Sequence, residues 1–69
     1  MMRLVINGIP QDYEGTPELE SLLKALEYGT ESRGIAVAIN NTVVPRRDIS
    51  RVVLKDGDRI EIIEAVQGG

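Results

Sequence analysis

The C-terminal residues Gln67-Gly68-Gly69 are the part of the sequence whose residue types could support covalent chemistry. Glycine has no Cβ, so two glycines in a row can enter a narrow channel and adopt whatever backbone angles an active site demands. Residues 66–69, beginning at Val66, reach roughly 13 Å when extended. The α-carboxylate of Gly69 is ionised near neutral pH and can attack an activated phosphate. We therefore expect a terminal carboxylate that a partner enzyme adenylates, after which sulfur or another nucleophile can be accepted.

The rest of the composition argues against an enzyme. The chain contains no cysteine and no histidine, which removes the thiol nucleophile and the commonest general base and nitrogen metal ligand. Asp56-Gly57-Asp58 is too short for a calcium loop, which needs more oxygen ligands at set spacing, and is typical of a tight turn. No glycine-rich phosphate loop is present. We expect neither a bound cofactor nor a bound metal.

Charge and hydropathy restrict the partners and the location. The net charge of −3 argues against nucleic acid as a partner. No stretch approaches the roughly 20 apolar residues of a membrane span. The N-terminal run of apolar residues is interrupted at Asn7-Gly8, which argues against a signal peptide. A reducing cytoplasm is the expected location.

Two surface features could contact a protein partner. Arg46, Arg47 and Arg51 form a local excess of positive charge, either a solvated surface or a docking site for an acidic patch. If Ile60 and Ile62 face the core, alternation places Ile63 on the opposite face. We expect Ile63 to be a single exposed side chain or to join Val5 or Val44 in an apolar patch for a partner.

The elements that would carry these residues follow from local patterns. Asn7-Gly8 is typical of a type I′ hairpin turn, and Asn40-Asn41 is a second turn signal. Thr16 is expected to cap a helix that begins at Pro17 and ends before Gly29 at C′. The expected strands are residues 2–7, 9–13, 35–40, 42–44 and 59–65, with the helix after the second strand and an irregular or short helical connection at 46–54.

This order predicts an α+β fold with one main helix on a mixed or largely antiparallel sheet of four to five strands. Pro10 cannot donate to a strand ladder, so residues 9–13 are expected at a sheet edge. The first and last strands can lie side by side in the middle of such a sheet, and a central last strand would anchor the tail. The predicted organisation is one domain over residues 1–65 and a flexible tail over residues 66–69.

With these elements in place, the chain resembles the ThiS family of sulfur carrier proteins in thiamine biosynthesis. The resemblance covers nearly the whole chain, and its C-terminal third is the specific part. The residues that carry it are Asn7-Gly8, Leu22-Leu23, Val37-Ala38-Ile39-Asn40, Val44-Pro45-Arg46, Lys55-Asp56-Gly57-Asp58-Arg59-Ile60-Glu61-Ile62 and Ala65-Val66-Gln67-Gly68-Gly69. Asn41 departs from the pattern, because glycine is frequent there.

The resemblance implies a ubiquitin-like β-grasp fold and a defined role for the tail. A ThiF-type adenylyltransferase would activate the carboxylate of Gly69 with ATP and Mg²⁺. Sulfur from cysteine, delivered through a desulfurase, would convert this carboxylate to a thiocarboxylate. A ThiG-type thiazole synthase would then take the sulfur for the thiazole ring of thiamine. Gly69 would carry the sulfur, Gly68 would be its flexible neighbour, and Gln67 and Val66 would complete the tail.

The sequence is also compatible with two other functional hypotheses. The small subunit of molybdopterin synthase, of MoaD type, shares the fold and the Gly-Gly tail but passes sulfur to a pterin precursor. A ubiquitin-like interaction module would have incidental terminal glycines, and its partner function would not require Gly69. An independent enzyme is the least favoured reading.

Overall fold

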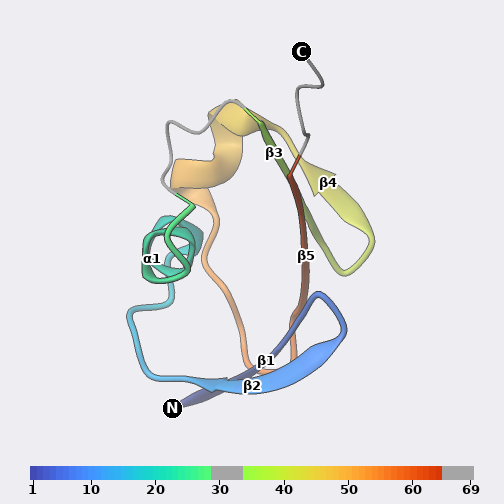
Figure 1. The fold of residues 1–69 in the computed structure, drawn as a ribbon. Helices are drawn as coiled ribbons and strands as arrows, with labels where there is room; N and C mark the ends of the chain where they lie inside the picture. The colour runs from blue at the N-terminus through green and yellow to red at the C-terminus, as the bar shows by residue number, and fades with distance from the viewer. Residues whose placement is uncertain (29–33, 65–69) are drawn as a thin grey trace.

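The computed structural model describes residues 1–28 and 34–64. It shows a five-stranded mixed sheet with the helix α1 and the 3₁₀ helix η1 on one face (Figure 1). The elements, in chain order, are β1 (Met2–Ile6), β2 (Ile9–Tyr13), α1 (Leu19–Ala25), β3 (Ile35–Ile39), β4 (Thr42–Val44), η1 (Arg46–Arg51) and β5 (Arg59–Glu64). This confirms the predicted α+β class, the five strands and the short helical connection before the last strand.

The strand order β2-β1-β5-β3-β4 puts the last strand in the middle of the sheet. Strand β5 is parallel to β1, with Val5 beside Arg59, and antiparallel to β3, with Ile35 beside Glu64. Strand β2, which contains Pro10, lies at the edge. Both placements agree with the sequence prediction.

The core lies between the sheet and the two helices. Within the described residues, the buried side chains are all apolar and aliphatic. The spacing of the leucines on α1 puts Leu19, Leu22 and Leu23 on one stripe that faces the sheet. Their buried partners come from the strands and from the segment around η1: Leu4, Ile6, Val37, Ile49, Leu54, Ile60 and Ile62.

The helix begins later than the sequence predicts. Glu18 is the N-cap residue, with extended backbone angles, rather than Thr16, and Pro17 precedes the helix. The reason is a short antiparallel bridge: the carbonyl of Pro17 accepts from the Leu54 amide at 2.7 Å. The Leu19 amide donates to the carbonyl of Val52 at 3.0 Å. Long-range pairing therefore holds this segment extended and overrides the local capping signal.

The helix also ends earlier than predicted, and its C′ residue is Glu27 rather than Gly29, which lies outside the described residues. Glu27 has a left-handed φ of 67°, and its amide donates to the carbonyl of Lys24. The Tyr28 amide donates to the carbonyl of Leu23 at 2.9 Å. These two bonds form a Schellman motif, which normally favours glycine at C′. Glu27 therefore holds backbone strain at the end of α1.

Glu27→Gly is expected to stabilise the protein by about 1 kcal/mol, because glycine adopts the left-handed conformation without steric cost. Urea denaturation followed by circular dichroism measures this change. Glu27→Ala is the matched control, since it removes the same charge from the helix C-terminus and keeps the strain. Equal midpoints for the two variants would contradict a strained Glu27.

Both predicted hairpin turns are present. Asn7 and Gly8 have φ values of 50° and 83°, and Asn40 and Asn41 have φ values of 51° and 71°. Positive φ at both central residues is the requirement of a type I′ turn. Asparagine tolerates this region, so Asn41 replaces the glycine that is frequent there without loss of the turn.

Candidate functional site

The candidate site begins where β5 ends. Strand β5 extends to Glu64, and residues 65–69 follow it. The predicted site residues Val66, Gln67, Gly68 and Gly69 lie outside the described residues, as does the boundary between domain and tail. The structure therefore describes the end of β5, residues 62–64, from which this segment continues. We call these residues the root of the C-terminal segment.

Two different neighbours hold the root. On one side β3 follows β5 to its last residue, with Ile35 beside Glu64. On the other side β1 accompanies only the start of β5, and its last register pair is Ile6 with Ile60. Beyond that pair, the side-chain Oδ1 of Asn7 accepts a hydrogen bond from the Ile62 amide at 2.8 Å.

The start of β5 is held by a second asparagine. The Oδ1 of Asn40 accepts from the Arg59 amide at 3.0 Å, and its Nδ2 donates to the Oδ1 of Asp58 at 2.9 Å. The other oxygen of Asp58 accepts from the Lys55 amide at 2.8 Å. Both hairpin turns that flank β5 thus contribute a side chain to its backbone.

The sheet face opposite α1 carries the predicted exposed isoleucine. Ile63 is 65% exposed, whereas Ile60 and Ile62 are buried, which confirms the alternation expected from the sequence. Paired residues share a face, so Ile63 lies beside Ala36, while Ala38 lies beside Val43. We call Ala36, Ala38, Val43 and Ile63 the outer patch.

The composition of the outer patch differs from the prediction. Val44 pairs with Val37 and packs against the core, so it lies on the helix side of the sheet and was wrongly expected beside Ile63. Val5 pairs with Arg59, at the other end of β5 from Ile63. Alternation within β4 places Val43, which is 71% exposed, on the outer face instead.

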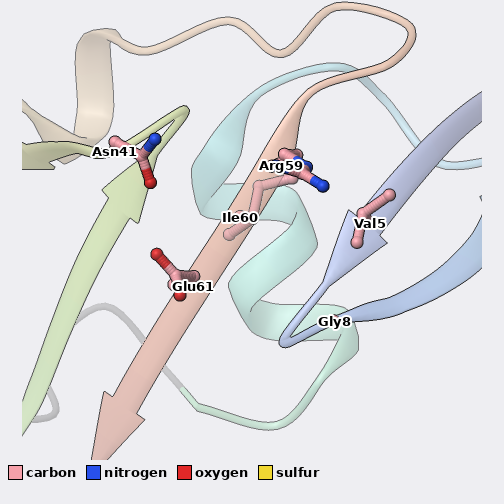
Figure 2. Close-up of a pocket in the computed structure, with 6 residues that line it drawn as sticks. All are labelled: Val5, Gly8, Asn41, Arg59, Ile60 and Glu61. Atoms are coloured by element: carbon pink, nitrogen blue, oxygen red, sulfur yellow. The ribbon is translucent and has the colours of Figure 1, made fainter.

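A shallow hollow of about 270 Å³ lies along the start of β5, between the two hairpin turns. Figure 2 shows α1 behind the sheet and the hollow bordered by β1 on one side and the β3–β4 turn on the other. Arg59 and Glu61 lie two positions apart on β5, so both side chains belong to the outer face. The lining residues are Val5, Gly8, Asn41, Arg59, Ile60 and Glu61. On the outer face, β5 therefore carries the apolar Ile63 near its end and the oppositely charged Arg59 and Glu61 nearer its start.

The basic cluster is not part of this face. Arg46, Arg47 and Arg51 are exposed on η1, whose Ile49 is buried in the core on the helix side of the sheet. Figure 1 shows η1 near the end of the sheet where β5 ends. The predicted contact residues thus form two separate surfaces, one at Ile63 and one on η1. Both surfaces lie near the end of β5.

Other kinds of site are not found in the described ranges. Residues 1–28 and 34–64 contain no cluster of acidic side chains that could hold a metal ion. In the same ranges, no helix has the length and apolar character needed to cross a membrane.

Comparison with known proteins decides the family. The model of the ThiS family matches residues 4–69. The chain belongs to the ThiS family. The match includes β5 and the residues after it, which carry the Gly-Gly sequence.

A solved structure shows that this ThiS-family chain has the ubiquitin-like β-grasp fold expected from the sequence. The crystal structure of the thiamine biosynthesis protein ThiS from Geobacter metallireducens matches with a TM-score of 0.80 and 30% identity. The match covers 99% of this chain and 100% of that one.

Curated relatives fall into two groups. The sulfur carrier protein ThiS of Thermus thermophilus is 34% identical, over 93% of this chain and 95% of the relative. The thiazole synthase of Paramagnetospirillum magneticum is 38% identical over 99% of this chain, but the match is only 20% of that protein. The chain thus spans about a fifth of the length of this longer relative, and of a second thiazole synthase from Magnetococcus marinus.

In this ThiS-family chain the sequence analysis missed the role of two asparagine side chains. Asn7 and Asn40 were read only as turn formers, yet each Oδ1 accepts a backbone amide of β5. The sequence contained one indication of this role. Asparagine occupies the first position of the turn in both hairpins, although aspartate or glycine would also suit a type I′ turn there.

Proposed function

We propose that the chain is a sulfur carrier protein of thiamine biosynthesis, whose Gly69 carboxylate becomes a thiocarboxylate. The observation that carries the proposal is the ThiS-family match through residue 69, which includes the Gly-Gly sequence. The similarity to the Thermus thermophilus ThiS over nearly its full length supports it. In this proposal the chain is the substrate of partner enzymes rather than a catalyst.

The chemistry follows from the properties of a carboxylate. A carboxylate oxygen of Gly69 attacks the α-phosphorus of ATP, pyrophosphate leaves, and an acyl-adenylate forms. Mg²⁺, bound with ATP in a ThiF-type enzyme, neutralises the developing charge on the phosphates. A persulfide sulfur from the desulfurase pathway then attacks the carbonyl carbon and AMP leaves. A thiol reduces the S–S bond of the resulting acyl disulfide, which releases the thiocarboxylate and leaves the thiol oxidised. Glycines at positions 68 and 69 suit this sequence of attacks because they present no side chain to the active site.

The proposed acceptor of the sulfur is a ThiG-type thiazole synthase, and the proposed sulfur source is cysteine through a desulfurase. Two thiazole synthases contain a segment that is 38% and 37% identical to this chain. The presence of a similar segment within those proteins supports an association between this fold and thiazole synthase.

The first step is tested by ATP–pyrophosphate exchange with a ThiF-type enzyme. The proposal predicts exchange of labelled pyrophosphate into ATP that depends on this chain and on Mg²⁺. The same reaction without the chain is the control. An enzyme that adenylates its own cognate carrier but shows no exchange with this chain would contradict the proposal.

We further propose that the outer patch and the basic cluster Arg46, Arg47 and Arg51 contact these enzymes. Ile63 is central to this proposal, because a large exposed apolar side chain beside the small Ala36 leaves room for a partner's side chain. The outer patch adjoins the root of the C-terminal segment, so a protein bound there lies close to Gly69. The charges of η1 would steer an acidic partner toward the same end of the sheet.

Ile63→Asp is expected to raise the KM for the adenylating enzyme by roughly 10- to 100-fold, the size of the loss at an interface hot spot. Steady-state adenylation kinetics measure it. Ile9→Asp is the matched control, because Ile9 is 61% exposed but lies on edge strand β2, beside Ile6. Equal KM values for the two variants would rule out a special role for the outer patch.

A further inference from the structure

We propose that Asn7 is a positioning residue that fixes the point at which the C-terminal segment leaves the sheet. The inference rests on the proposed function, since it concerns how Gly69 is presented to the adenylating enzyme. Its basis is the hydrogen bond from the Ile62 amide to the Asn7 Oδ1, 2.8 Å long and partly buried. The bond joins residues that are 55 positions apart in the sequence.

Asn7 continues a strand ladder after its strand has ended. The main-chain amide of Asn7 donates to the carbonyl of Ile60 at 2.9 Å, which is the last ladder bond of the β1–β5 pair. The chain then turns away at Asn7-Gly8 with φ values of 50° and 83°. The next amide of β5 on this side belongs to Ile62, and the Asn7 side chain takes the place that a strand carbonyl would occupy.

The bond between Asn7 and Ile62 matters because it lies where β1 no longer pairs with β5. Beyond Ile60, β1 offers no further register pair, so β3 and the Asn7 side chain are the two described neighbours that hold the backbone of β5. A partly buried amide that loses its acceptor favours local opening, and strand ends open more easily than strand centres. Loss of the bond would therefore leave residues 62–64 held by β3 alone, so this end of β5 would open more often.

Opening of residues 62–64 would change the presentation of Gly69 more than the recognition of the fold. Three more mobile residues add roughly 10 Å of reach and many more conformations to the segment after Glu64. Productive placement of a reacting group falls as its tether lengthens and loosens. Ala36, Ala38 and Val43 of the outer patch lie on β3 and β4 and keep their structure, whereas Ile63 lies on the part of β5 that opens. We thus expect Asn7 to act mainly on the kcat of adenylation, with a smaller rise in KM than Ile63→Asp causes.

The second hairpin provides a matched control. Asn40 also occupies the first position of a type I′ turn, with a φ of 51°, and its Oδ1 accepts from the Arg59 amide. Asn40→Gly removes the corresponding bond at the start of β5, together with the bond to Asp58, far along the strand from Glu64. Glycine suits the positive φ at both sites, so Asn7→Gly and Asn40→Gly test the side chains without backbone strain. Asn7→Asp keeps an oxygen acceptor and serves as the rescue variant.

Two measurements on the full chain test the inference. Amide hydrogen exchange by NMR on the isolated protein is expected to be faster at Ile62 and Ile63 in Asn7→Gly, unchanged there in Asn40→Gly, and close to wild type in Asn7→Asp. Adenylation by a ThiF-type enzyme is expected to lose about tenfold in kcat in Asn7→Gly, with a rise in KM that stays below the rise in Ile63→Asp. Asn40→Gly should keep the kcat, and Asn7→Asp should recover most of it.

The outcomes separate this inference from the proposed function. Unchanged exchange at Ile62 in Asn7→Gly, or the same kcat for Asn7→Gly and Asn40→Gly, would overturn the inference while wild-type adenylation still supports the carrier function. A wild-type chain that is not adenylated would overturn the carrier function and with it the kinetic role of Asn7. The exchange result would then still decide whether Asn7 holds the end of β5.

Discussion

Deletion of Gly69 is expected to abolish thiocarboxylate formation and to leave the fold unchanged. The shortened chain still ends in a glycine carboxylate, now that of Gly68, but this carboxylate lies about 3.5 Å closer to β5. A displacement of about 1 Å at a reacting centre can cost roughly 100-fold in rate, so the expected loss is at least that large. Intact mass after incubation with ATP, Mg²⁺, a ThiF-type enzyme and a sulfur source measures the product.

Two controls make the deletion interpretable. Circular dichroism and urea denaturation should give the wild-type signal and midpoint, because every buried residue of the described core precedes residue 65. Gly69→Ala keeps the length and the carboxylate but adds a Cβ, so it tests the requirement for a residue without a side chain. Full sulfur loading of the deletion variant would contradict a requirement for Gly69 itself.

Ile60→Ala is expected to destabilise the protein by about 2–5 kcal/mol, the usual cost of a large-to-small change in a well-packed core. Ile60 is 1% exposed on the central strand and faces α1. A chain of this length has a total stability of roughly 3–10 kcal/mol, so this variant should lose a substantial fraction of its stability. Urea denaturation at 25 °C measures the loss.

Ile63→Ala is the matched control on the same strand. It makes the same chemical change three residues later, but Ile63 is 65% exposed on the outer face, so the cost should stay below about 1 kcal/mol. Similar losses for the two variants would contradict the assignment of the two faces of β5. The same pair should show the opposite order in partner binding, with the larger effect at Ile63.

The sequence was sufficient where local rules and burial agree. Alternation along residues 59–64 predicted which isoleucines are buried, and Asn7-Gly8 predicted a turn whose φ values are positive. The edge position of β2 followed from Pro10, which cannot donate to a neighbouring strand. These features depend on one residue or one short pattern at a time.

The errors lie where distant segments meet. Thr16 and Pro17 resemble a helix start, but the bridge to residues 52–54 keeps Glu18 extended, and no local pattern contains that information. The acceptor role of Asn7 toward Ile62 likewise depends on β1 lying parallel to β5, a pairing across the whole chain. Val44 was misplaced because the register of β4 with β3 decides its face. The roles of residues 66–69 remain predictions.

The central claim is that Gly69 carries sulfur, and the mass of the intact chain tests it most directly. The protein is incubated with ATP, Mg²⁺, a ThiF-type adenylyltransferase, a cysteine desulfurase, cysteine and a thiol reductant. The account predicts a mass gain equal to the replacement of one oxygen by sulfur, located by fragmentation at Gly69 and lost when ATP is omitted. An unchanged mass, under conditions in which the same enzymes load their own carrier, would contradict it.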